Sequence, residues 1–166
     1  HSDGRVVTWG NQSLRQRNDA PSDAGYVAIS CGRDHSCALH KSGRIVCWGN
    51  NSYHQLDAPT DAGYRAISCG FSHTVALRID GGVVAWGSNS KGGRDKMRLD
   101  GAPTDAGYVA IAAGDRHSVA LRDDGRVVTW GAQDYQQRTG APTDEGYVAI
   151  ACGAQFLRRC ATTEAS

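Results

Sequence analysis

Tyr26-Val-Ala-Ile-Ser-Cys-Gly32 is one of four near-copies of a single heptapeptide in this chain of 166 residues. The other copies are Tyr64-Arg-Ala-Ile-Ser-Cys-Gly70, Tyr108-Val-Ala-Ile-Ala-Ala-Gly114 and Tyr147-Val-Ala-Ile-Ala-Cys-Gly153. The spacings between the four tyrosines are 38, 44 and 39 residues. A period near 40 residues with many strand-forming residues indicates a β-propeller or a solenoid, because each repeat is one small unit that must stack on its neighbours.

A second phrase, Gly-x-Val/Ile-Val-x-Trp-Gly, also occurs four times and ends at Gly10, Gly49, Gly87 and Gly131. From the first motif to the end of the second, the third repeat is predicted to form antiparallel strands, because short runs rich in β-branched residues alternate with turn residues. We expect strands at 109–113, 117–122 and 126–130. Asp123-Asp-Gly125 predicts a type I′ hairpin turn between the second and third strands.

The predicted fold is all-β: a β-propeller of antiparallel three- to four-stranded blades, with about four blades. A fourth strand would be short and would lie in the polar stretch after each Trp-Gly. We interpret residues 1–166 as a single repeat domain. Its repeats span about 26–63, 64–107 and 108–146, and partial copies fill 1–25 and 147–166.

The two partial copies complement each other. Residues 1–10 supply a hairpin turn and a third strand, whereas residues 147–160 supply a first strand. One hypothesis is that these ends share a sheet and close a four-blade ring. The alternative is an open arc that is part of a larger propeller, which would expose an apolar blade face and tend to self-associate.

Recurring aromatic and histidine positions are interpreted as structural. One small sheet cannot bury both of its faces, so large rings at equivalent places predict packing between blades, with ligand stacking as the alternative. The histidines begin the second strand of each copy and are followed by Ser or Thr, which predicts a hydrogen bond to the adjacent turn; a shared metal is the alternative. These repeat positions are Trp9, Trp48, Trp86, Trp130, His35, His73 and His117.

The six cysteines are interpreted as small core side chains. Three of them share one slot with an alanine, and a disulfide or zinc site is the less favoured alternative because no Cys-x-x-Cys spacing occurs. Cys160 lies outside the repeat pattern and is the expected reactive thiol. Reduced thiols favour an intracellular location, cytoplasmic or nuclear. The aligned sets are Cys31, Cys69, Ala113 and Cys152; Cys37, Val75 and Val119; and Cys47, Ala85 and Thr129.

Composition excludes several classes of function. The formal net charge is +1, from 18 basic and 17 acidic residues, which argues against a surface that grips nucleic acid throughout. No apolar run is long enough to span a bilayer, so no membrane association is expected. Phosphate loops, nucleophile elbows and His-Glu-x-x-His motifs do not occur. We therefore expect neither an enzyme nor a bound cofactor.

Residues 28–39 together with 42–49, and the matching stretches 66–87 and 110–131, resemble the regulator of chromosome condensation repeat family, in a short-repeat variety. The resemblance implies a β-propeller. It also implies a choice of functions, because members include a GTPase exchange factor, a photoreceptor, enzyme inhibitors and modules of ubiquitin ligases. The basic tail and inserted wedge of the exchange factor are not recognisable here, and Phe156-Leu-Arg-Arg-Cys160 replaces the expected His-Ser-x-Ala-Leu.

The segments that differ between copies follow each Trp-Gly and are the candidate binding loops, because binding residues concentrate on loops held by a rigid scaffold. By repetition, all of them should emerge on one face. The leading hypothesis is a non-enzymatic module that binds a protein partner there; the alternatives are a regulator or exchange factor of a small GTPase and a propeller-type enzyme inhibitor. The candidate partner-binding residues are Arg15, Arg17, Tyr53, His54, Lys91, Arg94, Lys96, Met97, Arg98, Tyr135 and Arg138.

Overall fold

A computed structural model describes residues 2–9, 19–88, 99, 101–132, 140–153 and 161–164. These residues form three three-stranded antiparallel sheets and one two-stranded sheet, which confirms the all-β prediction. None of them forms a helix that could cross a membrane. The strands are β1 (Tyr26–Cys31), β2 (His35–His40), β3 (Ile45–Gly49), β4 (Tyr64–Cys69), β5 (His73–Arg78), β6 (Val83–Gly87), β7 (Tyr108–Ala113), β8 (His117–Arg122), β9 (Val127–Gly131), β10 (Tyr147–Ala151) and β11 (Ala161–Glu164).

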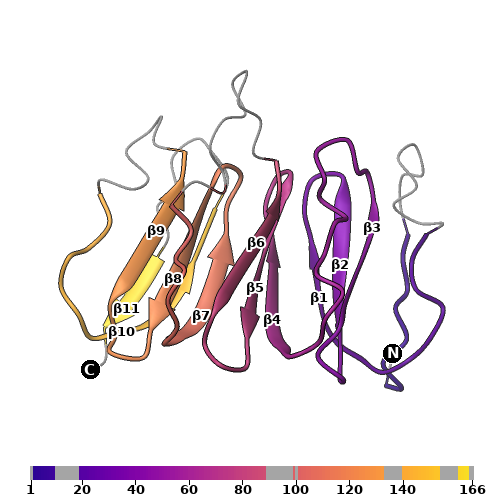
Figure 1. Ribbon diagram of the computed structural model, residues 1–166, viewed down its shortest axis with the longest axis horizontal. Helices are drawn as coiled ribbons and strands as arrows, with labels where there is room; N and C mark the ends of the chain where they lie inside the picture. Colours follow the sequence, from indigo (N-terminus) through magenta and orange to yellow (C-terminus); the bar gives the residue numbers. More distant parts are fainter. Residues whose placement is uncertain are drawn as a thin grey trace.

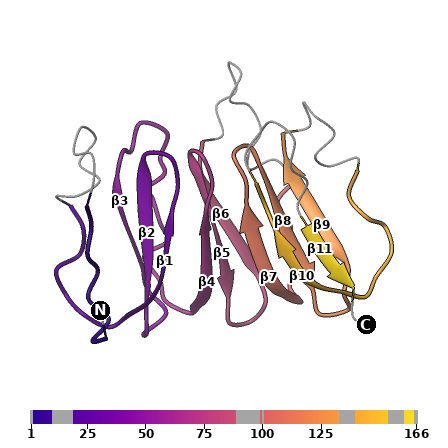
Figure 2. The same cartoon turned by 180° about the vertical axis from the view of Figure 1, so that it is seen from behind.

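The sheets are the blades of a propeller and stand side by side (Figure 1). We call them blade A (β1–β3), blade B (β4–β6), blade C (β7–β9) and blade D (β10–β11). The first strands of successive blades contact one another, and each also packs on the middle strand of the preceding blade, as β4 does on β2. Figure 2 shows the same succession from behind. The predicted strand boundaries of the third repeat agree with blade C to within one residue.

The hairpin between the second and third strands differs from the predicted type I′ turn. Gly43, Gly81 and Gly125 have φ of 82°, 85° and 82°, but the residues before them do not have positive φ. In blade A, the amide of Gly43 donates to the carbonyl of His40 at 2.8 Å. One ordinary turn followed by one left-handed glycine is the three-residue hairpin with a glycine bulge, so only the glycine position is special.

Main-chain hydrogen bonds join each blade to the hairpin of the blade before it. The amides of Tyr64 and Tyr108 donate to the carbonyls of Gly43 and Gly81 at 3.1 and 3.0 Å. The amide of Tyr26 donates in the same way to Gly4 at 3.0 Å. Residues 2–9 therefore lie where the hairpin and third strand of a preceding blade would lie.

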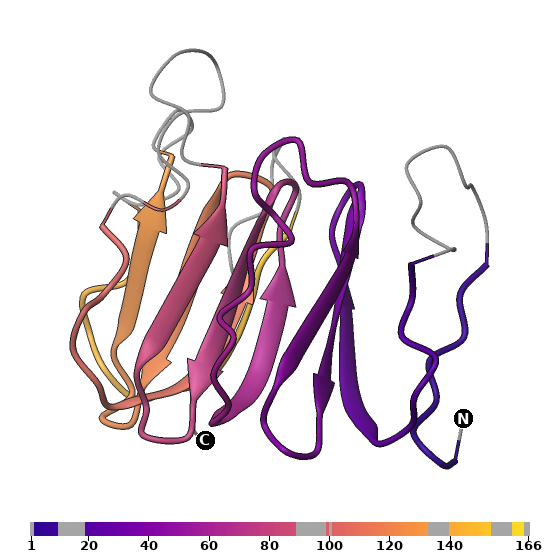
Figure 3. The same ribbon diagram turned by 45° about the vertical axis from the view of Figure 1, so that its right-hand side comes forward.

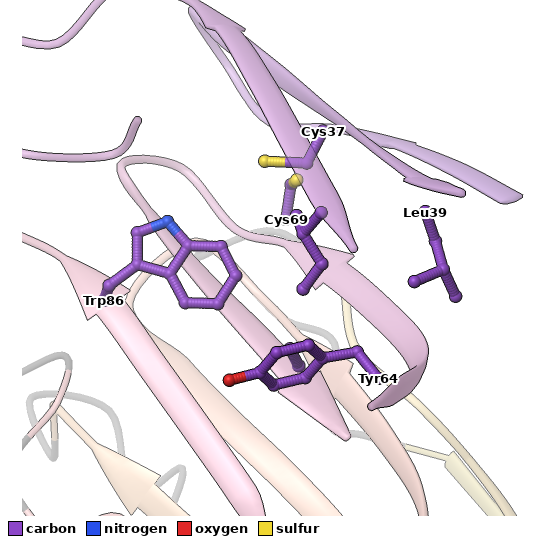
Figure 4. Close-up of a cluster of buried hydrophobic side chains, with 7 residues drawn as sticks. Cys37, Leu39, Tyr64, Cys69 and Trp86 are labelled. Carbon is purple, nitrogen blue, oxygen red and sulfur yellow. The ribbon is translucent and has the colours of Figure 1, made fainter. Parts of the chain in front are cut away.

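The core lies between blades and contains the buried rings of Trp86 and Trp130, whereas Trp9, for which the same packing role was predicted, is exposed. Tyr64 and Trp86 of blade B pack on Leu39 and Ile45 of blade A (Figure 4). Tyr108 and Trp130 of blade C pack likewise on Val75 and Leu77 of blade B. Burying these rings gives each interface most of its stability, since an aromatic side chain removes the largest apolar area from water.

The predicted four-blade ring is wrong for this structure. β10 pairs with β11, not with residues 1–10. The N-terminal segment and blade D lie at opposite ends of the row (Figure 3; compare Figure 1). At the N-terminal end, Trp9 is 84% exposed and borders a hollow of about 340 Å³ with Val27 and Ile29. The structure is thus the open arc that was the alternative, since residues 2–9 form no strand pair with β10 or β11 of blade D.

The polar stretch after the third strand is described in blade A alone. There, residues 50–57 form turns and contain no strand. Blade A is accordingly three-stranded, as are the described parts of blades B and C.

The cysteines were interpreted as unbonded core side chains, and their reduced state was used to predict an intracellular location; the first interpretation is wrong for three of them, and the second loses its support. Cys37 and Cys47 form a disulfide between β2 and β3, and Cys152 is also disulfide-bonded. Positions 37 and 47 are direct cross-strand partners, which brings the two thiols within bonding reach. The intracellular prediction rested on reduced thiols, so the disulfides remove its basis and the location stays a prediction.

The shared cysteine slot is buried at Cys69 but exposed at Cys31. The physical reason is the neighbouring blade. Cys69 lies against Ser30 of blade A, and its thiol donates to the Ser30 carbonyl at 3.3 Å. Cys31 belongs to the first complete blade of the arc, and the described residues place no complete blade before it.

Candidate interaction face

Three turns and one loop emerge at the same end of the blades, on the upper side of Figure 1. The turns are residues 32–34, 70–72 and 114–116, which join the first and second strands, and the loop is residues 50–57, which follows β3. We call this end the turn face. Its position follows from the antiparallel order, because the first and third strands of a blade end on the same side and the hairpins lie on the other.

A hollow of about 360 Å³ opens on the turn face, where the turns of blades A, B and C meet Cys152 and Gly153 at the end of β10. Its floor is made of glycines, and neighbouring turns approach so closely that a side chain does not fit between them. A Cβ atom at Gly32 would lie 2.4 Å from the carbonyl oxygen of Gly70, and one at Gly70 would lie 2.4 Å from that of Gly114. The repeat glycines therefore set the distance between blades at the axis.

Charged and aromatic side chains border the hollow. The guanidinium of Arg33 lies 4.4 Å from the centre of the Phe71 ring, which is a cation–π contact between blades A and B. Arg33 also forms an ion pair with Asp34, at 3.6 Å. Asp115 of blade C lines the same hollow. The face thus combines a flat aromatic and arginine surface with both signs of charge.

The loop 50–57 is held by its own hydrogen bonds. The side-chain oxygen of Asn51 accepts from the amide of Leu56 at 2.8 Å, and that of Gln55 accepts from the amide of Tyr53 at 2.8 Å. Trp86 of blade B donates to the carbonyl of Gln55 at 2.9 Å. Gln55 is 1% exposed, so the loop is anchored in the A–B interface.

Tyr53 and His54, two of the predicted binding residues, project from this anchored loop and are exposed. His54 has φ of 64°, a left-handed conformation that few residues other than glycine adopt. Its Nδ1 lies 2.8 Å from Asp57, and hydrogen bonds from Asn51 and His54 lower the pKa of that carboxyl group. The other nine predicted binding residues, from Arg15 to Arg138, lie outside the described residues.

The repeat histidines have the structural role that was predicted, but their partner is different. His35 Nε2 lies 2.8 Å from the hydroxyl of Thr74, and His73 Nε2 lies 2.8 Å from that of Ser118. Each histidine thus bonds the next blade and not its own turn. Both rings are buried, at 1% and 0% exposure, so these hydrogen bonds cross the blade interfaces beneath the turn face.

Acid should weaken the A–B interface through His35. Burial lowers the pKa of His35 from 6.5 to about 4, although nearby Asp34 partly opposes the shift. Since the folded pKa is the lower one, the neutral ring stabilises the fold fully above pH 6.5, and this contribution is lost as the pH falls toward 4. We expect the free energy of unfolding to fall by about 1–2 kcal/mol between pH 7 and 5.

Urea unfolding at pH 7, 6 and 5 measures this slope. His35→Gln should flatten it, because glutamine can donate to Thr74 without titrating. Burial also lowers the pKa of His117, so part of the slope should remain in this variant. Equal stability of the wild type at pH 7 and 5 would contradict the assignment.

Arg33, Phe71 and Asp115 line the hollow but were not among the candidate residues selected from the sequence. A signal for them was present: they stand directly after the repeat glycine, and this position differs in every copy. Among the free thiols of the described part, burial raises the pKa of Cys69 to about 11, which makes it unreactive, whereas Cys31 is exposed. The predicted reactive thiol, Cys160, lies outside the described residues.

Comparison with known proteins agrees with this architecture. The regulator of chromosome condensation (RCC1) repeat matches residues 26–55, 64–92 and 108–137, which is more than half of the chain. The chain belongs to the RCC1 repeat family. Each matched segment of this RCC1-repeat chain begins at the first residue of a blade, Tyr26, Tyr64 or Tyr108. A search of curated proteins found no match.

Solved structures with a similar fold are longer chains. The entire ectodomain of the Physcomitrella patens receptor kinase CR4 is 26% identical with a TM-score of 0.75, over 93% of this chain and 43% of that one. The CRINKLY WD40 ectodomain of Arabidopsis thaliana ACR4 is 23% identical with a TM-score of 0.63, over 81% and 45%. Yeast RCC1 (Prp20), bound to Kap60, is 20% identical with a TM-score of 0.64, over 90% and 48%. The chain therefore spans less than half the length of these structures.

Proposed function

We propose that this chain is a non-enzymatic module that binds another protein through the turn face. The observation that carries the proposal is the hollow where the blades meet, bordered by the Arg33–Phe71 contact. Arginine and aromatic residues supply most of the binding energy at protein interfaces, and they do so best beside a pocket that a partner side chain can fill.

The fixed conformation of the loop 50–57 on the turn face supports the same proposal. The loop 50–57 is fixed by internal hydrogen bonds and by Trp86, so Tyr53 and His54 are held in place before a partner arrives. A pre-ordered loop loses little conformational entropy on binding, which leaves more of the contact energy as affinity. Arg15, Arg17 and the residues of the 91–98 loop remain proposed contributors to this face.

Relatives with the same fold bind proteins. Yeast RCC1 (Prp20) is bound to Kap60 in one solved structure, and the structure of Prp20p is described together with its binding properties to Gsp1p and histones in another. At 20% and 18% identity these similarities establish the fold alone. They support the proposal that the partner is a protein, but they do not identify it. We keep the whole chain, 1–166, as one proposed repeat domain.

Two positions on one strand test which face binds. Phe71 precedes β5 on the turn face, and Ile79 follows β5 on the hairpin side, where it is 69% exposed. A photo-crosslinking amino acid is placed at each position in turn, and extracts of the source organism are irradiated. We expect a specific adduct from position 71 and none from position 79.

The captured protein is then purified and titrated against point variants. Arg33→Ala and Tyr53→Ala should each weaken binding about tenfold or more, as interface anchors do, while Lys41→Ala in the opposite hairpin should not. Adducts from position 79 alone, or equal binding by all three variants, would overturn the proposal. Accelerated nucleotide release from a captured small GTPase would support the alternative of exchange regulation.

A further inference from the structure

Three potential metal ligands lie together in the interface between blades A and B. The imidazole of His35 and the sulfurs of Cys37 and Cys69 are all buried, and their ligand atoms lie within 4.8 Å of one another. The hydroxyl of Thr74 lies among them, 2.8 Å from His35 Nε2, 3.8 Å from Cys37 Sγ and 3.7 Å from Cys69 Sγ. Figure 4 shows the two sulfurs directed toward one another across the interface.

The next interface shows that the fold does not need these sulfurs. Between blades B and C, His73 bonds the hydroxyl of Ser118 at 2.8 Å, in the same geometry as His35 and Thr74. The two sulfur positions are occupied there by Val75 and Ala113. The A–B interface therefore has two soft ligands beside a histidine, in positions that hold apolar side chains in the B–C interface.

In the structure, one of the two sulfurs is blocked, because Cys37 is bonded to Cys47. Reduction opens this bond: two molecules of a thiol reductant become one disulfide, and the Cys37 and Cys47 sulfurs each receive a proton. Cys37 then has the reduced Cys69 thiol on one side and His35 on the other. Thiolate and imidazole are the ligands that zinc prefers.

We propose that reduction of the Cys37–Cys47 disulfide creates a Zn²⁺ site formed by His35, Cys37 and Cys69. Zinc–sulfur bonds of about 2.3 Å at tetrahedral angles place sulfurs roughly 3.7 Å apart, so the ligands need to approach by only about 1 Å. Binding releases the protons of the two thiols, and water or the Thr74 hydroxyl fills the fourth position. The ion enters from the turn-face hollow, which Cys69 lines.

Since its ligands come from β2 of blade A and β4 of blade B, the site would join two blades. The disulfide, by contrast, joins two strands of a single blade. The redox state would thereby decide whether this sulfur stabilises blade A alone or the contact between blades A and B. The proposal does not depend on the partner proposed above.

Cys47→Ala tests the site without any reductant. The same slot holds Ala85 in blade B, so the blade tolerates the change, and Cys37 becomes permanently free. The probe is Co²⁺, which reports a tetrahedral thiolate site by visible d–d bands and a near-ultraviolet sulfur-to-metal charge-transfer band. We expect the Cys47→Ala protein to bind one Co²⁺ per chain with both signatures, and Zn²⁺ to bleach them. The oxidised wild type should show neither.

Further substitutions in the Cys47→Ala background identify the ligands. Cys37→Val and Cys69→Ala copy the residues of the B–C interface and should each abolish the bands. Cys31→Ala changes an exposed thiol outside the cluster and should leave them intact. Bands that survive Cys69→Ala, or a folded Cys47→Ala protein with free thiols and no bands, would overturn the proposal. Should Cys47→Ala fail to fold, phosphine-reduced wild type gives the same readout, and the absence of bands there would be equally decisive.

Discussion

Replacing Trp130 with alanine is expected to lower the free energy of unfolding by about 3–5 kcal/mol. The ring is fully buried, at 0% exposure, and packs on Val75 and Leu77 of the preceding blade. Its removal leaves a large cavity at the B–C interface that the neighbouring blade cannot fill. Because whole domains are stabilised by only about 5–15 kcal/mol, this one change should bring the protein close to unfolding. Equilibrium urea unfolding followed by circular dichroism measures the loss.

Trp9→Ala is the matched control for that prediction. Trp9 has the same place in its repeat, but no described blade precedes it and it is 84% exposed. Its removal should change the free energy of unfolding by less than about 0.5 kcal/mol. Equal losses at positions 9 and 130 would contradict the account, since they would mean that the N-terminal ring is as buried as the others.

Gly70→Ala is expected to cost about 1–3 kcal/mol, with blades B and C forced apart at the axis. The new Cβ would lie 2.4 Å from the carbonyl oxygen of Gly114 and 2.2 Å from Cε1 of His73. Contacts this short require a shift, and a backbone oxygen cannot move aside as a flexible side chain can. The same urea titration measures the effect.

Gly82→Ala provides the comparison within the same blade. Its Cβ would meet only side-chain atoms of Asp80 and Arg78, at 3.2 and 3.5 Å. The equivalent hairpin positions already hold Arg44 and Arg126, so a side chain fits there. We expect a change within about 0.5 kcal/mol. A harmless Gly70→Ala would show that the turns do not pack on one another.

The repeating positions made the blades predictable from the sequence. A tyrosine, a glycine and a tryptophan that return every 40 residues or so are expected to have similar environments wherever a blade precedes them. Trp86 and Trp130 pack between blades in this way, whereas Trp9, which no described blade precedes, is exposed. The role of the histidines was correct in kind but not in partner, because Thr74 and Ser118 come from the following blade.

The disulfide and the open ring were not predicted from the sequence. The first depends on residues that differ between the repeats, and the second depends on where the two ends of the chain lie. Cys37 aligns with two valines and Cys47 with Ala85 and Thr129, so the alignment indicated small packed side chains. The hairpin register alone would have revealed the disulfide, since Leu39 pairs with Ile45 and positions 37 and 47 must then face each other. The prediction of a closed ring failed because residues 2–9 pair with no strand of blade D, whose second strand is residues 161–164, a segment without the repeat signature.

Part of the candidate site could be located in advance. Loop variation pointed to Tyr53 and His54, which are exposed on the turn face, and their role in partner binding stays a prediction. The hollow itself was not predictable, because no single repeat contains it. It forms where the repeat glycines of successive blades lie close together. Its bordering residues, Arg33 and Phe71, come together only when two blades are side by side.

Hydrogen exchange of the backbone amides, followed by mass spectrometry, tests the central claim that the chain is an open arc of propeller blades. Amides in β5 and β8 are paired on both sides and lie beneath the blade interfaces, so they should exchange slowly. Val7 and Trp9 are exposed and lie outside every described strand pair, so their amides should exchange much faster than those of β5 and β8. Strong protection of these residues, equal to that of β10 and β5, would contradict the account, because it would mean that the two ends of the chain share a blade and close the ring.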